Sequence, residues 1–420
     1  MDVVCLGESM VTFLPSRPGR LADVPAFHRG IGGAESNVAC ALAAAGHRVK
    51  WVGRVGSDGF GDHLVDAIAG YGVDVSAVRR DAARPTGIYF RTATDRATET
   101  HEVAYYRAGS AASAMGPANV PYPDLLGGRV LHLSGITAAL SANCLELLRD
   151  LTAPRPGRPL LSFDVNHRPG LWRGRDTGPG VLLDLARRCD LVFVGEDEAA
   201  QVWDVHGPDA VRAALPEPEV LVVKRGAEGA TVFSRLAPAG EAGDAVGAEK
   251  ARPGVVRSGE AGHGEVRSAS AAGDARHEDA RHEDAWSGEV PPQAGHGEAG
   301  HGEVPSEDVR YGEVPPGPAP DIVTTVPALH VDVVAPVGAG DAFAAGFLSA
   351  TLRGLPVRDR ARHGHLMAAA VLTVPGDLAR PPLRAHADRL AALDDTAWGR
   401  LRLGPGWTAA DQADEEVPQT

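Results

Sequence analysis

Cysteine is scarce in this sequence, with four residues among 420. Cys5, Cys40, Cys144 and Cys189 lie far apart, mostly within apolar runs, and no C-x-x-C spacing occurs. Neither a disulfide framework nor a cysteine-based metal site has the residues that it needs. We expect all four thiols to be reduced and buried in the core.

Long apolar runs and an excess of basic residues are also missing. No stretch reaches the roughly 18 consecutive apolar residues of a membrane helix, and the N-terminal MDVVCLGE has neither the basic region nor the apolar segment of a signal peptide. Lys and Arg number 41 against 55 Asp and Glu, so the formal net charge is −14. Nucleic acids and anionic membranes repel such a chain. The composition predicts a soluble cytoplasmic protein with no nucleic-acid or membrane partner.

Residues 237–320 differ from the rest because they repeat short polar motifs such as GHGE, ARHEDA and GEVP. Such a composition cannot bury a core, so it predicts a disordered insertion. The segment holds the histidines His263, His277, His282, His296 and His301. Their acidic, glycine-rich surroundings favour weak adventitious metal binding over a fixed site. What remains is one domain formed by 1–236 and 321–405, with a flexible tail at 406–420.

Outside the insertion, continuous apolar runs alternate with helical patterns. The runs of buried-strand length are 128–136, 159–168, 190–198 and 219–229, and the helical patterns are 36–46, 61–72, 144–151 and 181–189. Strand and helix in repetition predict an α/β fold, a mostly parallel sheet flanked by helices on both faces. In 87–107, apolar and polar residues alternate around a polar turn, which is typical of a hairpin with one solvated face. We expect a small β-lid there, beside the main sheet.

The stretch VDVVAPVGAGDAFAAGF, residues 331–347, passes from an apolar run through a glycine turn into a helical pattern. At the carboxyl end of a parallel strand, a helix N-terminus presents free N–H groups and a partial positive charge. Gly338 and Gly340 allow that backbone to approach an anion closely, so the loop suits a phosphate. Asp341 in the first turn would then accept a proton from the hydroxyl that attacks the phosphate. An N-capping aspartate after a glycine turn explains the same residues equally well.

Two distant motifs together resemble a known family. VGAGDAFAAGF resembles the C-terminal signature of the ribokinase-like (PfkB) carbohydrate kinases, and GGAESNVACALAAAG (32–46) with VGRVGSDGFG (52–61) resembles the N-terminal one. The P-loop motif G-x-x-x-x-G-K-[ST] is absent, and no G-x-G-x-x-G follows a strand. The resemblance covers nearly all of 1–236 and 321–400. It implies a ribokinase-like α/β fold, ATP and Mg²⁺ as cofactors, and phosphoryl transfer to a sugar hydroxyl.

Within the family, the closer likeness is to 2-keto-3-deoxygluconate kinase. It is carried by PTGIYF (85–90), VAYYRAGSAAS (103–113), LHLSGITAALS (131–141), FDVNHRPGLW (163–172) and VVKRGAEGA (222–230). This likeness implies phosphorylation of a primary hydroxyl of a small sugar acid, 2-keto-3-deoxygluconate, to its 6-phosphate. It also implies a lid built from about 10–30 and 86–108, through which a homo-oligomer can form.

The family's site residues carry over onto matching positions of this sequence. Asp341 matches the catalytic base, and Gly338, Ala339 and Gly340 match the anion hole around the transferred phosphate. Positions that match contacts to the sugar acid are Gly33, Tyr89, Tyr105, Arg107, Arg168 and Asp377. Positions that match contacts to the nucleotide are Asn166, Arg168, Lys224, Gly226, Gly229, Gly338 and Gly340.

Some interpretations stay open. Glu198 matches a glutamate that supports Mg²⁺ in many relatives, but Gly195 stands where their N-x-x-E motif has asparagine. The tyrosines of the predicted lid could instead be hairpin aromatics facing the core, and Arg107 could be a surface arginine. Two other functions remain: a kinase of the same family for a neutral sugar such as fructose or ribose, and a sugar-sensing or scaffold protein that has kept the fold.

Overall fold

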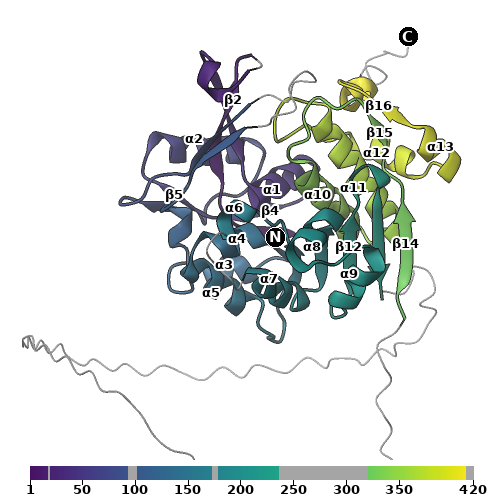
Figure 1. The fold of residues 1–420 in the computed structure, drawn as a ribbon, viewed down its shortest axis with the longest axis horizontal. Helices are drawn as coiled ribbons and strands as arrows, with labels where there is room; N and C mark the ends of the chain where they lie inside the picture. The colour runs from purple at the N-terminus through teal and green to yellow at the C-terminus, as the bar shows by residue number, and fades with distance from the viewer. Residues whose placement is uncertain (18, 93–101, 173–177, 236–319, 413–420) are drawn as a thin grey trace, which may run out of the picture. The chain divides into compact units, whose positions relative to one another are not determined.

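The computed structural model describes residues 1–17, 19–92, 102–172, 178–235 and 320–412 (Figure 1). These residues belong to one compact unit. Residues 237–319, which the sequence predicts to be disordered, lie outside the described part of the chain, and so do the histidines within them.

An eight-stranded sheet forms the centre of the fold. In spatial order its strands are β14 (Ile322–Val326), β13 (Ala230–Ser234), β12 (Val220–Lys224), β11 (Leu191–Gly195), β10 (Leu160–Asp164), β9 (Val130–Ser134), β1 (Val3–Leu6) and β4 (Val49–Val52). From β4 to β12 the neighbours are parallel, whereas β13 and β14 join antiparallel. The predicted mostly parallel sheet is confirmed, and the four predicted apolar runs form β9, β10, β11 and β12.

Alternate residues of these strands contribute to two separate cores, because successive side chains of a strand point to opposite faces. In β1, Val3 and Cys5 belong to one apolar cluster, whereas Val4 and Leu6 belong to the other. The first cluster includes residues of α1 (Ala34–Ala44), α2 (Gly59–Gly70), α10 (Ala339–Leu352), α11 (Val357–Leu372), α12 (Arg384–Ala391) and α13 (Asp395–Arg400). The second includes residues of α3 (Tyr122–Leu126), α4 (Gly135–Leu140), α5 (Ala142–Leu151), α6 (Pro169–Trp172), α7 (Gly178–Arg187), α8 (Glu196–Trp203) and α9 (Pro208–Ala214). Helices therefore cover both faces, as predicted (Figure 1).

A smaller four-stranded sheet forms the lid, with β2 at the top of Figure 1. Its strand order is β3 (Phe27–Gly32), β2 (Met10–Pro15), β7 (Ile88–Arg91) and β8 (Val103–Tyr106). Only β2 and β7 pair in parallel; the other neighbours in this sheet are antiparallel. The rings of Phe13 and Phe90 stack with centroids 4.6 Å apart and join two of its strands. The hairpin predicted at 87–107 is β7 and β8, although residues 93–101 lie outside the described part.

The predicted insertion interrupts a hairpin at the sheet edge. β13 and β14 are antiparallel neighbours, and Ser234 pairs with Ile322. The chain therefore leaves for 237–320 and returns at adjacent points, as expected where residues have been added to a surface turn.

Short elements complete the fold. β5 (Arg54–Gly56) pairs with β6 (Arg79–Asp81), and β15 (His330–Val331) pairs with β16 (Arg402–Leu403). The 3₁₀ turns are η1 (Leu21–Asp23), η2 (Ala112–Ala114), η3 (Gly226–Glu228) and η4 (Trp407–Gln412). The last one corrects the predicted tail at 406–420: Trp407 is buried, with its ring centroid 6.0 Å from that of His386. The domain continues past residue 405 because burial of this large ring stabilises the turn.

Two further expectations can be compared with the structure. All four cysteines are buried and none forms a disulfide, as predicted. None of the helices that the structure describes is long and apolar enough to cross a membrane.

Candidate active site

A cavity of about 350 Å³ lies where the carboxyl ends of β10 and β12 face the lid. The N-terminal ends of α1 and α10 complete its wall. The predicted site residues in its lining are Gly33, Tyr89, Tyr105, Arg107, Asn166, Arg168, Glu198, Lys224, Gly338, Ala339, Gly340, Asp341 and Asp377. Gly226 and Gly229 are not part of this wall, and they shape the η3 turn just after β12. The fold thus gathers residues from both halves of the sequence around one space.

Asp341 lies in the first turn of α10, with its carboxylate in the cavity wall. Its Oδ2 accepts a hydrogen bond from Asn37 Nδ2 at 2.9 Å, and its Oδ1 accepts one from Asn166 Nδ2 at 3.5 Å. Withdrawal from water raises the pKa of Asp341 to about 7; the Asn37 bond opposes this rise and the nearby Asp164 carboxylate adds to it. A carboxylate with a pKa near neutrality is suited to accept a proton.

The backbone before Asp341 is shaped to receive an anion. Gly338 has a φ of 80°, in the left-handed region, and a Cβ there would lie 2.4 Å from the carbonyl oxygen of Asp377. The first hydrogen bond within α10 runs from the N–H of Ala342 to the carbonyl of Gly338 at 2.9 Å. The N–H groups of the three residues between them precede the helix's own hydrogen bonds and remain available to a ligand.

An ion pair joins the ends of β10 and β12 next to this loop. Lys224 Nζ donates to Asp164 Oδ2 at 2.8 Å and to Oδ1 at 3.1 Å. Burial disfavours the charge on Lys224, but the carboxylates of Asp164, Glu198 and Asp341 outweigh it and raise the pKa of the lysine. A Cβ at Gly340 would lie 3.5 Å from Lys224 Nζ. The ammonium group is therefore charged and lies beside the glycine turn that begins α10.

Arg107 of the lid is held by a buried carboxylate. Its Nη2 forms an ion pair with Glu8 Oε2, and the two side chains are 9% and 1% exposed. Ser110 Oγ donates to the other oxygen, Glu8 Oε1, at 2.6 Å. The guanidinium carbon also lies 5.8 Å from the centre of the Tyr105 ring. Arg107 is thus not a surface arginine.

A second ion pair joins the neighbouring lid strand, β7, to the segment after α11. Arg91 Nη2 is 2.7 Å from Asp377 Oδ1, and both side chains are 4% exposed. Tyr89 Oη donates to Asp377 Oδ2 at 2.5 Å. Burial raises the pKa of Asp377, although the charge of Arg91 and the Tyr89 bond oppose this rise. Arg91 and Tyr89 of the lid therefore already bind the carboxylate of Asp377, the residue that was predicted to contact the substrate.

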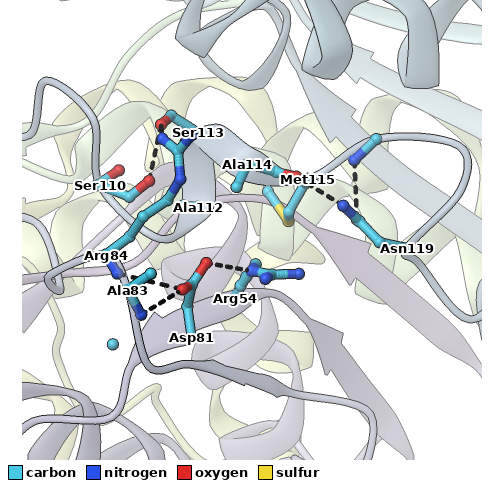
Figure 2. Close-up of polar contacts among 12 residues, drawn as sticks. Arg54, Asp81, Ala83, Arg84, Ser110, Ala112, Ser113, Ala114, Met115 and Asn119 are labelled. Atoms are coloured by element: carbon cyan, nitrogen blue, oxygen red, sulfur yellow. Dashed lines mark hydrogen bonds and ion pairs between the residues drawn. The ribbon is translucent and has the colours of Figure 1, made fainter. Parts of the chain in front are cut away.

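Figure 2 shows how the segment after β8 is fixed. Asp81 accepts hydrogen bonds from Arg54 Nε at 2.9 Å and from two backbone N–H groups of the following turn. In that turn, Arg84 Nη1 donates to Ser113 Oγ at 3.4 Å, and Ser113 Oγ donates to the carbonyl of Ser110 at 2.7 Å. This network holds Ser110, whose hydroxyl donates a hydrogen bond to the buried carboxylate of Glu8.

Glycines let β3 approach the cavity closely. A Cβ at Gly32 would lie 2.2 Å from Tyr89 Oη, and one at Gly33 would lie 2.3 Å from the carbonyl oxygen of Glu8. Any larger residue would push the start of α1 outward. The two glycines therefore allow α1 to bring Asn37 to the carboxylate of α10.

The remaining predicted residues surround the opening. Arg168 forms only a long ion pair, with its Nη1 3.8 Å from Glu198 Oε1, and its side chain is 49% exposed. Glu198 Oε2 accepts the N–H of Gly195 at 2.8 Å and so caps the start of α8 without the family's asparagine. Asn166 is buried with a φ of 42°, and its Oδ1 has no hydrogen-bond partner within the described residues. A strained residue with an unsatisfied amide oxygen at a cavity points to a ligand.

Sequence reasoning missed Glu8, Asn37, Arg91 and Asp164. Glu8 and Asp164 lie at or just beyond the ends of parallel strands, where sites of such sheets gather, so that rule could have found them. Asn37 carries no comparable signal, because its bond to Asp341 joins positions 304 residues apart. For Arg91, the sequence indicates only a position in a strand of alternating polar and apolar residues, which gives no signal of a functional role.

Comparison with known families identifies the class of protein. A family model described as pfkB family carbohydrate kinase matches residues 1–255 and 321–383. The chain belongs to this family, and it is therefore a phosphotransferase that acts on a hydroxyl of a small sugar-type substrate. Membership in this kinase family implies the use of ATP. The predicted family, fold and enzyme class are confirmed.

Individual relatives narrow the class but name more than one substrate. The chain is 34% identical over 236 residues to a 2-dehydro-3-deoxygluconokinase of Thermoproteus tenax, across 56% of this chain and 72% of that protein. It is 35% identical over 216 residues to a protein of the same name from Bacillus subtilis, across 50% and 65%. It is also 30% identical over 237 residues to fructokinase-1 of Oryza sativa subsp. japonica, across 56% and 73%.

Solved structures agree with the fold. A PfkB protein from Polaromonas sp. JS666 superposes with a TM-score of 0.64 at 29% identity, and the match covers 92% of this chain and 99% of that one. A 2-dehydro-3-deoxygluconokinase from Thermotoga maritima reaches a TM-score of 0.62 at 19% identity, covering 94% and 100%, and supports the fold alone. The ribokinase-like α/β architecture is confirmed.

Proposed function

We propose that this enzyme transfers the γ-phosphoryl group of ATP to a primary hydroxyl of a small sugar acid, 2-keto-3-deoxygluconate, to give the 6-phosphate. The observation that carries this proposal is the cavity in which Arg107 and Arg168 lie with Asp341 and its glycine loop. Two relatives of at least 34% identity bear the name of this activity, 2-dehydro being synonymous with 2-keto.

Asp341 is the proposed base. Its raised pKa lets it take the proton of the attacking hydroxyl, and its two amide partners orient the carboxylate without neutralising it. The free N–H groups from Ala339 to Asp341 would stabilise the charge that develops on the transferred group. The capping interpretation does not account for the raised pKa or for the two amide partners of this carboxylate.

The residues present fit a nucleotide phosphate. The unpaired N–H groups of the Gly338 turn, the charged Lys224 and the unsatisfied oxygen of Asn166 converge on the same cavity. Gly226 and Gly229 would shape the turn over the rest of the nucleotide. Mg²⁺, when bound with ATP, neutralises phosphate charge. Glu198 would support it indirectly, because the described residues contain no group of three or more Asp, Glu, His or Cys side chains that could hold a metal alone.

The lid and the residues next to it are proposed to bind the sugar acid and to recognise its carboxylate. Arg107 already forms an ion pair with Glu8, which fixes the direction of its remaining N–H groups, and these would form charge-assisted hydrogen bonds to the substrate carboxylate. Arg168 is half-exposed, and its 3.8 Å ion pair with Glu198 is too long for a hydrogen bond, so its guanidinium would supply the charge that a substrate carboxylate requires. Tyr89, Tyr105 and Asp377 would contact the sugar hydroxyls, while Gly33 leaves space for the chain of the sugar.

A neutral-sugar kinase is the second candidate. It is favoured by the fructokinases among the relatives and by the pairing of Arg91 and Arg107 with buried carboxylates. A coupled ADP-release assay with 2-keto-3-deoxygluconate, gluconate, fructose and ribose distinguishes the two. We expect kcat/KM to be highest for the first substrate, with phosphorus NMR placing the phosphate on the primary hydroxyl. A higher kcat/KM for fructose or ribose would refute the sugar-acid assignment.

The lid is also the proposed contact between subunits. Tyr105 and Tyr106 are exposed on β8, the edge strand of the lid sheet. An edge strand with exposed aromatic rings is suited to pair with a second copy. Light scattering of the wild type and of Tyr106→Lys tests this proposal, and an unchanged molar mass would contradict it.

A further inference from the structure

A second cavity, of about 850 Å³, lies at the other ends of the helices that build the active site. Its lining comes from the C-terminal ends of α1 and α2, from α10 and α11, and from the segment that leads into α12. The two cavities share no lining residue. The proposed reaction gives this space no role.

Its charged groups are cationic. Arg353 Nη2 lies 2.7 Å from Asp388 Oδ2, and His363 Nε2 lies 3.1 Å from Oδ1 of the same residue, so these two groups share one carboxylate. Arg384 Nη2 donates to the backbone carbonyl of Ala45 at 3.1 Å. Within the described part of the chain, neither Arg380 nor Arg384 forms an ion pair. Two arginine charges are therefore left without a carboxylate on a protein of net charge −14.

The backbone between these arginines is rigid. The sequence from Arg380 to Arg384 is Arg-Pro-Pro-Leu-Arg, and both prolines are buried. Proline rings fix φ near about −65°, which restricts the segment before any ligand arrives. A backbone that is already restricted between the two arginines lowers part of the entropy cost of binding an anion to both.

We propose that this cavity is an effector site for a small phosphate monoester. Such a group carries about −1.5 to −2 charges at neutral pH and three acceptor oxygens, which matches two arginine forks better than a single carboxylate does. The volume accommodates an organic metabolite rather than a bare ion. Tyr71 and Leu383, both exposed and both in the lining, supply apolar surface for its carbon skeleton.

The same helices lead from this site to the active site. α10 carries Asp341 near its start and Arg353 at its C-terminal end, about 18 Å away along the helix axis. α1 carries Asn37 near the active site and lines the second cavity at its far end. A ligand that shifts α1 against α10 changes the Asn37 to Asp341 contact and the phosphate loop, so the effector and ATP influence each other's affinity by the same factor.

Calorimetry on the full chain tests the site. Glucose 6-phosphate is titrated in the presence of a saturating non-hydrolysable ATP analogue, which occupies the phosphate loop of the active site. Glucose, gluconate and sulfate are titrated in parallel. The variants are Arg380→Ala/Arg384→Ala, the milder Arg380→Gln, and the control Arg400→Ala, an exposed arginine of α13 outside the lining.

We expect wild type and control to bind glucose 6-phosphate, glucose not to bind, and the double variant to have a Kd about tenfold or more higher. Arg380→Gln, which keeps the bond to Ala45, should weaken binding in the same direction. Equal affinity in wild type and double variant would place the ligand elsewhere, and equal affinity for gluconate would overturn the phosphate assignment.

The Kd of the ATP analogue should change at least about fivefold with glucose 6-phosphate in wild type and not in the double variant. Binding without that change would overturn the effector role.

Discussion

Buried carboxylates have different partners at the carboxyl end of the main sheet, called the sheet edge below, and at the contact with the lid. At the sheet edge, Asp341 is bonded to two neutral amides, and its pKa is raised to about 7. Where the lid meets the rest of the domain, two arginines of the lid side are each joined to a buried carboxylate, Arg107 to Glu8 and Arg91 to Asp377. One region keeps a carboxylate ready to accept a proton, whereas the other is balanced before a substrate binds. We therefore assign the shared chemistry of the family to the sheet edge and the choice of substrate to the lid.

The largest expected effect concerns the unpaired carboxylate. Asp341→Asn keeps the shape of the side chain and its place in α10 but removes the proton acceptor, so kcat should fall by about 10²–10⁴ with little change in Tm. Steady-state kinetics and a thermal melt measure both quantities. The matched control is Asp209→Asn, which changes an exposed aspartate in the first turn of α9 and should leave kcat unchanged. Near-normal turnover in Asp341→Asn would show that this carboxylate is not the proton acceptor, and the proposed contrast between the two regions would fail.

The paired carboxylates should matter for stability instead. Arg91→Met leaves Asp377 buried without its cation, and the free energy of unfolding should fall by about 3–5 kcal/mol. The double change Arg91→Met/Asp377→Asn removes the lone charge and should recover much of this loss. Urea unfolding of wild type and both variants gives the values. If the single variant is as stable as wild type, the lid pair is not a structural unit.

Arg107 should separate the two candidate substrates. Arg107→Ala should lower kcat/KM for 2-keto-3-deoxygluconate by about 10- to 100-fold and for a poorly used neutral sugar by much less, because only the acid uses the charge-assisted bond. Arg107→Lys should recover part of the loss, since it keeps the charge without the planar fork. Arg107→Ala also leaves the buried Glu8 carboxylate without its cation. The double variant Glu8→Gln/Arg107→Ala therefore serves as the control for lid stability. Equal losses on both substrates would show that Arg107 supports the lid and does not read a carboxylate.

The raised pKa of Asp341 predicts the pH dependence. If Asp341 is the base, as proposed, it acts only when deprotonated, so activity should be full above its pKa of about 7 and should fall as the pH drops below that value. The loss should approach about tenfold per pH unit below 7 for a single protonation. A kcat/KM profile from pH 5 to 9, with enzyme stability checked at each point, measures it. A profile that stays flat down to pH 5 would contradict the role of this group.

The smallest effect is expected outside both regions. Replacement of residues 237–320 by a short glycine-containing turn should leave the enzyme folded and active, because Ser234 and Ile322 are already paired neighbours. Loop closure changes by only about 0.6 kcal/mol per doubling of length. Soluble yield and kcat of the shortened chain provide the measurement. Loss of either would show that the segment contributes to the domain.

Prediction from the sequence succeeded where the signal is local. Continuous apolar runs of strand length became β9 to β12, and the glycine turn before Asp341 became the start of α10, because both depend on neighbouring residues. The lid was recognised from its alternation for the same reason. The tail boundary was wrong, because burial of Trp407 depends on α12, which no local pattern reveals.

The pairings within the site could not be predicted in this way. Arg107 and Asp377 were assigned to the substrate, yet each is bonded to a carboxylate or an arginine of the protein itself. Glu8 is far from Arg107 in the chain, and Arg91 is far from Asp377. Only the closure of the lid over the sheet brings these charges within bonding distance.

The sequence by itself determined the family, the order of strands and helices, and the glycine turn before Asp341, because these rest on periodicity, glycine and short contiguous motifs. The tertiary structure alone decided the ionisation of Asp341, the balanced charges of the lid and the second, cationic cavity at the far ends of α1 and α10. The physical reason is that a pKa, an ion pair and a cavity depend on burial and on distances between segments that folding brings together.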